Sequence, residues 1–258
     1  MTRLRRHLED RRAQGRKLLV PYLMAGAPER DVFAMAAPAI AEFADALEIG
    51  IPYSDPLMDG PVIAAAGARA IAGGVGPGAA LDLTAALELP VPRVVMTYFN
   101  PIHAVGEQAF CSRAADAGVA GLIVPDLPVE ESSSLRKAAA QAGLAWIPLV
   151  SPTSSPARVG RITETATGFV YAVSTLGVTG ARAQLSERAA AVAGACREAT
   201  DLPVLVGIGV STPAHAVEAA AHADGVVVGS ALVKLLDEGG IAHAAALAAA
   251  MRAALDGP

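Results

Sequence analysis

Aromatic residues and cysteines are scarce in this chain of 258 residues. Phe, Trp and Tyr together make up 4% of it, although 53% of its residues are hydrophobic. The core must therefore consist mainly of Ala, Val, Leu and Ile, which suits closely packed strands and helices. The two cysteines, Cys111 and Cys196, form no Cys-x-x-Cys pair, and the five histidines are scattered. This usage implies neither a disulfide framework nor a metal site, so we expect no metal.

The chain also lacks a basic surplus and a long uninterrupted apolar run. Its net charge is -5, whereas a nucleic-acid-binding protein needs a basic face. Residues 1–17 are rich in arginine but have no apolar core, which argues against a secretory signal. The alanine-rich stretch 241–255 carries His243 and Arg252 and is too short to span a bilayer. We therefore expect a cytoplasmic protein that binds neither nucleic acid nor membrane.

Strand and helix patterns alternate along the whole chain, which is typical of repeated βα units. Eight such units in one chain favour a closed barrel over an open doubly wound sheet. The prediction is an α/β fold with a single (β/α)8 TIM-barrel domain over residues 1–258. The expected strands are residues 18–24, 45–50, 92–99, 121–124, 145–150, 169–174, 203–207 and 225–228.

Extra helices are expected at three places around this barrel. Leu4 and Leu8, four residues apart, indicate a short amphipathic N-terminal helix that covers the bottom of the barrel. Further helices are expected after the second and the eighth strand. The glycine-rich segment 73–78 resembles a phosphate loop but follows no strand and has no lysine, so we interpret it as a break between two helices.

The second strand and the loop after it contain two carboxylates. Period two places Glu48 on the inner face with Gly50, while Leu47 and Ile49 face the helices. A carboxylate inside an apolar barrel is costly, and burial raises its pKa. Asp59 follows on a proline-braced loop, so two carboxylates meet at one mouth, as proton transfer requires. Two structural alternatives stay open: Glu48 as a buried ion-pair partner, and Asp59 as an N-cap of the next helix.

Glycine-rich turns follow the seventh and eighth strands. Their backbone N–H groups and a helix N-terminus suit an anion, and barrels commonly bind phosphate at these two loops. The alternative is that the glycines only punctuate the turns. After the sixth strand, the loop 177–180 is a candidate lid that excludes water. The phosphate candidates are Gly207, Ile208, Gly209, Gly229 and Ser230.

Two tyrosines and one aspartate stand near the ends of other strands. Tyr98 and Tyr171 suit a flat, apolar part of a substrate, although each alone is more often a core or rim residue. Asp126 either orients a partner or caps the helix through Ser132, and we favour a structural role for it.

The stretch 47–61 resembles the signature of the tryptophan synthase alpha subunit family. It contains the glutamate Glu48, a Pro-aromatic-Ser-Asp-Pro turn at 52–56 and an Asp-Gly-Pro at 59–61. The resemblance continues in the same order along the chain, at residues 98–101, 125–131, 176–180, 207–209 and 229–234.

This resemblance implies a cofactor-free carbon–carbon lyase of the last stage of L-tryptophan biosynthesis. The family cleaves indole-3-glycerol phosphate into indole and glyceraldehyde 3-phosphate. Indole then passes to a beta subunit that carries pyridoxal phosphate, within an α2β2 heterotetramer. By the family's pattern, Glu48 handles the proton transfers and Asp59 accepts the indole N–H. The implied substrate-binding residues are Tyr22, Tyr98, Tyr171, Thr179, Gly180, Gly207, Ile208, Gly209, Gly229 and Ser230, and those implied in communication with the beta subunit are Asp55, Gly177 and Val178.

The chain departs from the family's pattern beside this loop. Met24 and Ala27 replace the usual Thr and Asp of the first turn, and residues 62–64 read Val-Ile-Ala instead of Thr-Ile-Gln. These changes bear on loop ordering and on coupling to the partner. Two alternatives therefore remain beside the main hypothesis: a stand-alone lyase of the same fold that needs no beta subunit, and a partner-activating module without catalysis.

Overall fold

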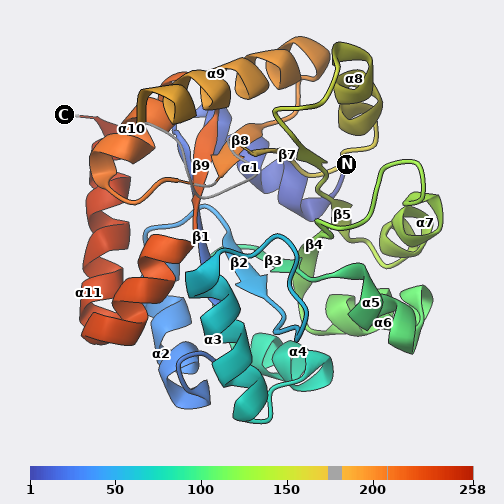
Figure 1. The fold of residues 1–258 in the computed structure, drawn as a ribbon, viewed down its shortest axis with the longest axis vertical. Helices are drawn as coiled ribbons and strands as arrows, with labels where there is room; N and C mark the ends of the chain where they lie inside the picture. Colours follow the sequence, from blue (N-terminus) through green and yellow to red (C-terminus); the bar gives the residue numbers. More distant parts are fainter. Residues whose placement is uncertain (174–181, 208, 258) are drawn as a thin grey trace.

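The computed structural model describes residues 1–173, 182–207 and 209–257 (Figure 1). Within these ranges nine parallel strands form one sheet in the order β5-β4-β3-β2-β1-β9-β8-β7-β6, and helices surround it. The strands are β1 Leu18–Met24, β2 Leu47–Gly50, β3 Arg93–Met96, β4 Val119–Ile123, β5 Ala145–Trp146, β6 Leu149–Val150, β7 Val170–Val173, β8 Val204–Gly207 and β9 Gly225–Val228. The helices are α1 Arg3–Ala13, α2 Arg30–Ala41, α3 Pro61–Ala72, α4 Pro77–Ala86, α5 Phe99–Val105, α6 Glu107–Asp116, α7 Ser133–Gln141, α8 Pro156–Glu164, α9 Arg182–Ala199, α10 Pro213–Ala221 and α11 Ser230–Asp256.

The sheet closes through β5 and β6, which are the two ends of this order and follow one another on the chain. The Ile147 N–H donates to the Leu122 carbonyl at 3.1 Å, and the Tyr171 N–H donates to the Pro148 carbonyl at 3.0 Å. The segment therefore pairs with β4 on one side and with β7 on the other. Because Pro148 has no N–H, the ladder is interrupted in its middle. The two short strands act as the fifth strand of a (β/α)8 barrel, as predicted.

The strands separate two layers of hydrophobic side chains. In β1, Leu18 and Val20 face the barrel interior, where they pack in one cluster with Phe169. Leu19 and Leu23 pack in the outer cluster between the strands and the helices. All seven residues of β1 are buried, as expected for a parallel strand with both faces covered.

Helix α1 covers the amino ends of the strands. Its Leu4 and Leu8 are fully buried and belong to the interior cluster of the barrel. Thr2 caps the helix by accepting the Arg5 N–H at 3.3 Å. In the view of Figure 1 the helix crosses behind the strands, so the predicted cover of the bottom is confirmed.

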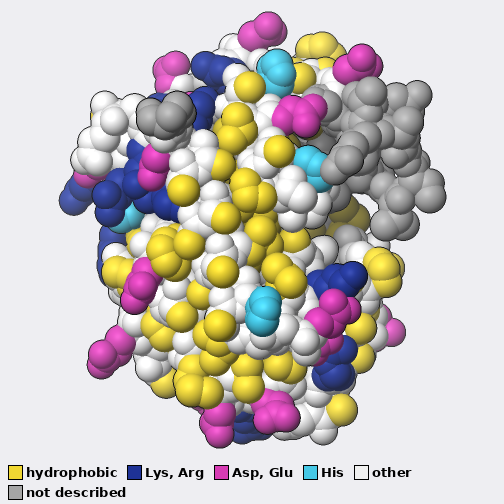
Figure 2. Space-filling view, turned by 90° about the vertical axis from the view of Figure 1, so that its left-hand side faces the viewer, with side chains coloured by type: hydrophobic (Ala, Val, Ile, Leu, Met, Phe, Trp, Pro, Cys, Tyr) yellow, Lys and Arg dark blue, Asp and Glu magenta, His cyan; other side chains and the backbone are white. Residues whose placement is uncertain are grey.

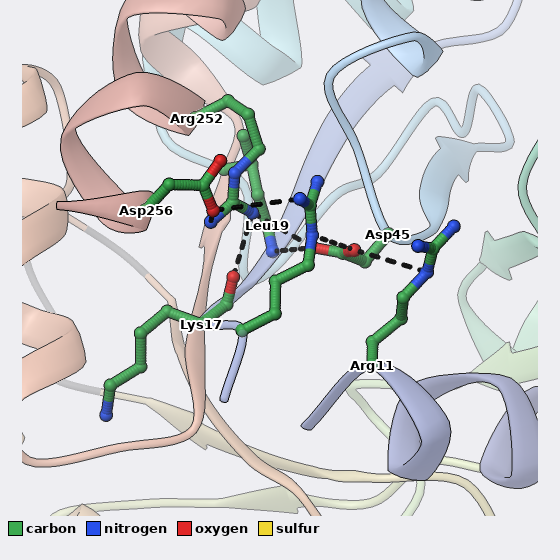
Figure 3. Close-up of polar contacts among 7 residues, drawn as sticks. Arg11, Lys17, Leu19, Asp45, Arg252 and Asp256 are labelled. Carbon is green, nitrogen blue, oxygen red and sulfur yellow. Dashed lines mark hydrogen bonds and ion pairs between the residues drawn. The ribbon is translucent and has the colours of Figure 1, made fainter. Parts of the chain in front are cut away.

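A buried carboxylate joins three parts of the chain at this bottom end (Figure 3). Asp45, fully buried, accepts hydrogen bonds from the Leu19 N–H at 2.9 Å, from Arg16 Nε at 2.8 Å and from Arg252 Nη1 at 3.1 Å. Arg252 also donates to the Lys17 carbonyl at 2.8 Å. The start of β1, the approach to β2 and the end of α11 are thereby fixed to one another.

The helices after β2 and β9 match the predicted extra helices. Helix α3 ends before the glycine-rich break, and α4 begins at Pro77 with a bend of 95° between the two. Among the described residues no single helix is long and apolar enough to cross a membrane. The bent pair of α3 and α4 reaches the required length and apolar composition only when its two helices are taken together. Helix α11 has a break at Gly240, whose φ is 75°.

The outer surface of α10 and α11 is poor in charge. Between Glu238 and Arg252, α11 contains no charged side chain. Figure 2 shows hydrophobic side chains spread over the middle of this side of the molecule, with charged side chains mostly near its edges. Small alanine side chains let these helices pack closely, which explains how a chain with few aromatic residues fills its core.

The region after β3 differs from the prediction. The strand ends at Met96 instead of residue 99, and α5 begins at Phe99. Pro101 lies in the first turn of α5, where a missing N–H costs no hydrogen bond. The Asn-Pro pair therefore belongs to a helix start and not to the end of a strand.

Candidate active site

Glu48 points into the barrel from β2, as its parity predicted. It is 1% exposed, and its Cα is in register with those of Tyr22 on β1 and Val94 on β3. Within the described part of the chain its Oε2 has no hydrogen-bond partner and no cation pairs with it, so the ion-pair alternative is wrong for these residues. Burial, and secondarily the charge of Asp59, raises the pKa of Glu48 to about 8. Glu48 therefore keeps its proton at neutral pH.

Asp59 lies on the loop between β2 and α3. Its Oδ1 accepts a hydrogen bond from the Tyr98 hydroxyl at 2.9 Å, and the same hydroxyl accepts the Met58 N–H at 3.0 Å. Gly60, and not Asp59, is the N-cap residue of α3, and no side chain caps that helix. The N-cap alternative for Asp59 is therefore wrong.

The two carboxyl groups differ in environment. Burial raises the pKa of Asp59, while the hydrogen bond from Tyr98 lowers it. Glu48 has no such donor among the described residues and is more deeply buried. The charge of Asp59 disfavours ionisation of Glu48, so the proton stays on Glu48 while Asp59 carries the charge. A neutral acid beside an ionised acceptor suits acid–base chemistry.

Three tyrosines surround this pair. The Tyr22 hydroxyl lies directly over Gly50, since a Cβ added at Gly50 would be 2.0 Å from it. The Tyr171 hydroxyl lies over Gly207 in the same way, at 2.2 Å. Burial raises the pKa of both phenols, and the Glu48 charge adds to this effect. Two of the predicted substrate-binding tyrosines, Tyr22 and Tyr171, thus stand as neutral phenols near Glu48, while Tyr98 bonds to Asp59.

The predicted phosphate loops lie at the carboxyl ends of β8 and β9. Gly207 ends β8, and Gly209 has a φ of 90°, a conformation that favours glycine. Gly229 is the N-cap residue of α11, and Ser230 is the first residue of that helix and is exposed. A Cβ added at Gly229 would lie 3.6 Å from the Tyr22 Cβ. The N-terminus of α11 therefore opens beside the tyrosine next to Glu48, where an anion is favoured.

Of the remaining predicted site residues, Asp55 lies within the described ranges. Asp55 is exposed and accepts a hydrogen bond from the Ser54 hydroxyl at 2.5 Å, on the loop that carries Asp59. Five other predicted residues lie outside the described ranges: Gly177, Val178, Thr179, Gly180 and Ile208.

The sequence did not reveal how Asp126 is used. Its Oδ1 accepts the Phe99 N–H at 2.9 Å. Ser132, the expected intermediate to a helix cap, instead donates its hydroxyl to the Val129 carbonyl at 2.9 Å. Residues 27 positions apart meet here because β3 and β4 are neighbours, and no local pattern announces such a bond.

Fold and site together define a (β/α)8 barrel with two unlike carboxyl groups suited to proton transfer at the carboxyl ends of its strands. Across the described ranges no group of three or more His, Cys, Asp or Glu side chains is placed to hold a metal ion.

Comparison with known proteins gives the family. Residues 8–255 match the family model of the tryptophan synthase alpha chain. The alpha chain from Gloeobacter violaceus is 53% identical over 221 residues, which cover 84% of this chain and 80% of that protein. The alpha chain from Streptomyces avermitilis is 46% identical, with 87% and 82% covered. The chain belongs to the tryptophan synthase alpha chain family.

Solved structures agree with this assignment. A tryptophan synthase structure from Mycobacterium tuberculosis has a TM-score of 0.92 and 41% identity, with 98% of both chains covered. The alpha subunit from Legionella pneumophila has a TM-score of 0.91 and 33% identity over the full length of both chains. The chain is thus an enzyme subunit of tryptophan biosynthesis, with the role of the alpha subunit in tryptophan synthase.

Proposed function

We propose that this chain cleaves indole-3-glycerol phosphate into indole and glyceraldehyde 3-phosphate, a retro-aldol reaction of a carbon–carbon lyase. The observation that carries the proposal is the buried, proton-holding Glu48 beside Asp59 in a barrel of this family. The reaction needs a proton donor and a proton acceptor but no electron sink beyond the indole ring. The alpha chain therefore requires no cofactor of its own.

The two carboxyl groups divide the chemistry. Protonated Glu48 gives its proton to C3 of the indole ring, and the ring becomes cationic. Ionised Asp59 accepts the ring N–H and stabilises that charge. The Glu48 carboxylate then takes the proton of the hydroxyl on the adjacent carbon, the carbonyl forms and the carbon–carbon bond breaks. Its electrons return to the ring, indole leaves as a neutral molecule, and Glu48 is protonated again.

The rest of the site positions the substrate. The phosphate binds to backbone N–H groups at Gly209, Gly229 and Ser230, together with Gly180 and its neighbours in the predicted lid. The α11 N-terminus beside Tyr22 supports this placement, because partial positive charge there favours a phosphate. Tyr22, on the strand next to Glu48, and Tyr171, on β7, contact the indole and glycerol parts.

The partner is a beta subunit that binds pyridoxal phosphate and consumes the indole, in an α2β2 complex in the cytoplasm. The loop that carries Asp59 supports this proposal. Asp55 is exposed on it, and so are two apolar side chains, Leu57 (80% exposed) and Met58 (41% exposed). Apolar side chains so exposed beside a site are typical of an interface. Residues 1–258 serve as one barrel domain in this assembly.

Product analysis tests the proposed reaction. The purified chain, incubated with indole-3-glycerol phosphate, is expected to form indole and glyceraldehyde 3-phosphate in equal amounts. Asp59→Asn, which removes the ionised acceptor, is expected to lower the rate by about 100-fold or more. Glu42→Gln, at an exposed acid after α2, serves as the matched control and keeps the full rate. Conversion by Asp59→Asn at the control's rate would contradict the proposed role of Asp59.

A further inference from the structure

Three hydrogen bonds link the carboxyl ends of β4, β3 and β2. Asp126, after β4, accepts the Phe99 N–H at 2.9 Å. Phe99 is adjacent to Tyr98, which follows β3. The Tyr98 hydroxyl donates to Asp59 at 2.9 Å and accepts the Met58 N–H at 3.0 Å. The bonds therefore lead from Asp126 to the loop after β2.

The middle of this series is tightly held. Tyr98 is the N-cap residue of α5 and is only 2% exposed, but its own side chain does not cap the helix. The Asp126 carboxylate satisfies the first N–H of α5 in its place. The Tyr98 ring packs against Tyr53 with centroids 5.3 Å apart. Because the Phe99 N–H belongs to the peptide that joins it to Tyr98, Asp126 fixes the backbone from which the Tyr98 ring projects.

We propose that Asp126 is a positioning residue for Asp59: it holds the start of α5, and thereby the Tyr98 hydroxyl that keeps the loop 58–59 in place. The inference rests on the proposed function, in which Asp59 must lie within reach of the indole N–H. It gives a role to a carboxylate that touches neither Glu48 nor the proposed phosphate site. A shift of the loop would leave Glu48 on its rigid strand and displace only Asp59.

A purely structural role for Asp126 makes a different prediction, and Asp224 provides the matched case. Asp224 accepts the Val204 N–H at 2.8 Å through Oδ2 and also lies 3.6 Å from Arg12, at the opposite end of the barrel. Both aspartates thus hold a backbone N–H of a neighbouring strand or helix start. Removal of either carboxylate should lower stability, but only loss of Asp126 should change the position and the pKa of Asp59.

The groups around Asp59 predict the direction in which its pKa should change. Glu48 on β2 and the phenols of Tyr22 and Tyr98 face it. Of these, the hydrogen bond from Tyr98 lowers the pKa of Asp59, against burial, which raises it. If the hydroxyl moves away, the pKa of Asp59 rises. The acidic limb of the pH profile of cleavage then shifts to higher pH, because Asp59 must be ionised.

The first experiment compares the pH profiles of kcat and KM for the wild type and five variants. Asp126→Ala and Tyr98→Phe should each lower kcat by about tenfold, with a smaller change in KM, and should shift the acidic limb upward. Asp126→Asn should restore the wild-type profile, because its amide oxygen still accepts the Phe99 N–H. Asp224→Ala should lower the melting temperature without moving the limb. The double variant Asp126→Ala/Tyr98→Phe should shift it no further than Tyr98→Phe alone. If Asp126→Ala behaves like Asp224→Ala, the inference is overturned.

A second measurement does not depend on the reaction. Hydrogen exchange at the Met58 amide should be about tenfold faster in Asp126→Ala than in the wild type, and unchanged in Asp224→Ala. If the wild type cleaves no indole-3-glycerol phosphate, the proposed function fails while this measurement still decides the role of Asp126. An unchanged Met58 amide in Asp126→Ala would overturn the inference even if the enzyme is active.

Discussion

At the scale of single residues, Glu48 shows how a barrel keeps a carboxyl group protonated at neutral pH. Its carboxyl group is buried within the barrel, where the charged form is poorly solvated, and an aspartate stands nearby. No cation within the described residues relieves this cost. The burial that keeps Glu48 protonated therefore makes its ionised form unfavourable for folding.

The pH dependence of stability should reveal this cost. Because the folded state raises the pKa of Glu48 from 4.5 to about 8, its contribution is fully favourable below pH 4.5 and is lost as the pH rises through 8. The free energy of unfolding of Glu48→Gln, relative to the wild type, should therefore improve by about 4 kcal/mol between pH 4.5 and pH 9. Urea unfolding at several pH values measures this difference. A constant difference across that range would show that Glu48 ionises normally.

Gly50 is a second residue on which the site depends. An added methyl group would lie 2.0 Å from the Tyr22 hydroxyl, so Gly50→Ala should displace the phenol and cost about 1–3 kcal/mol of stability. In a Tyr22→Leu background the same substitution should cost clearly less, which a double-mutant cycle of urea unfolding measures. Gly160→Ala, in helix α8 with open space around the added methyl, is the control and should not destabilise. Equal costs in both backgrounds would contradict the predicted contact.

At the scale of secondary-structure elements, Asp45 fixes the bottom of the barrel (Figure 3). Asp45→Ala leaves the buried Arg252 and the Leu19 N–H without their shared acceptor, and should cost about 3–5 kcal/mol. The cleavage rate per folded molecule should stay unchanged, because Glu48 and Asp59 face the opposite end. Asp82→Ala, which breaks an exposed pair with Arg113, should cost less than about 1 kcal/mol. Similar losses of stability in the two variants would show that the burial of Asp45 does not strengthen its contribution to stability.

The elements also show how far the sequence could predict the fold. Strand β1 has the predicted bounds, because Lys17 before it and Gly26 after it delimit a strong apolar pattern. The fifth strand was predicted as one piece and is divided at Pro148, which lacks an N–H. Helix α5 was missed because its first N–H bonds to Asp126, in the loop after β4.

The site, too, could be predicted where local patterns decide and not where residues distant in sequence meet. Parity placed Glu48 inside the barrel, since side-chain direction in a strand is a local property. The bond between Tyr98 and Asp59, 39 residues apart, depends on the contact between the ends of β2 and β3 and leaves no local signal.

At the scale of the whole molecule, the exposed loop of Leu57 and Met58 is expected to meet the beta subunit. Leu57→Asp should weaken binding of the beta subunit by about tenfold or more, because a charge would be buried in an apolar contact, and should leave stability unchanged. Ile71→Asp, at an apolar side chain on α3 that is 38% exposed, is the matched control. Isothermal titration with purified beta subunit measures both. Equal affinities for the two variants would place the interface elsewhere.

The central claim is that the chain cleaves indole-3-glycerol phosphate through Glu48 and does so in complex with a beta subunit. Its most direct test is the rate of indole release by the purified wild type and by Glu48→Gln, each with and without beta subunit. The account predicts slow release by the wild type alone, a strong rise with the beta subunit, and no release by Glu48→Gln under either condition. Fast release that ignores the beta subunit would indicate a stand-alone lyase. Release by Glu48→Gln at the wild-type rate, or no release by the wild type at all, would contradict the account.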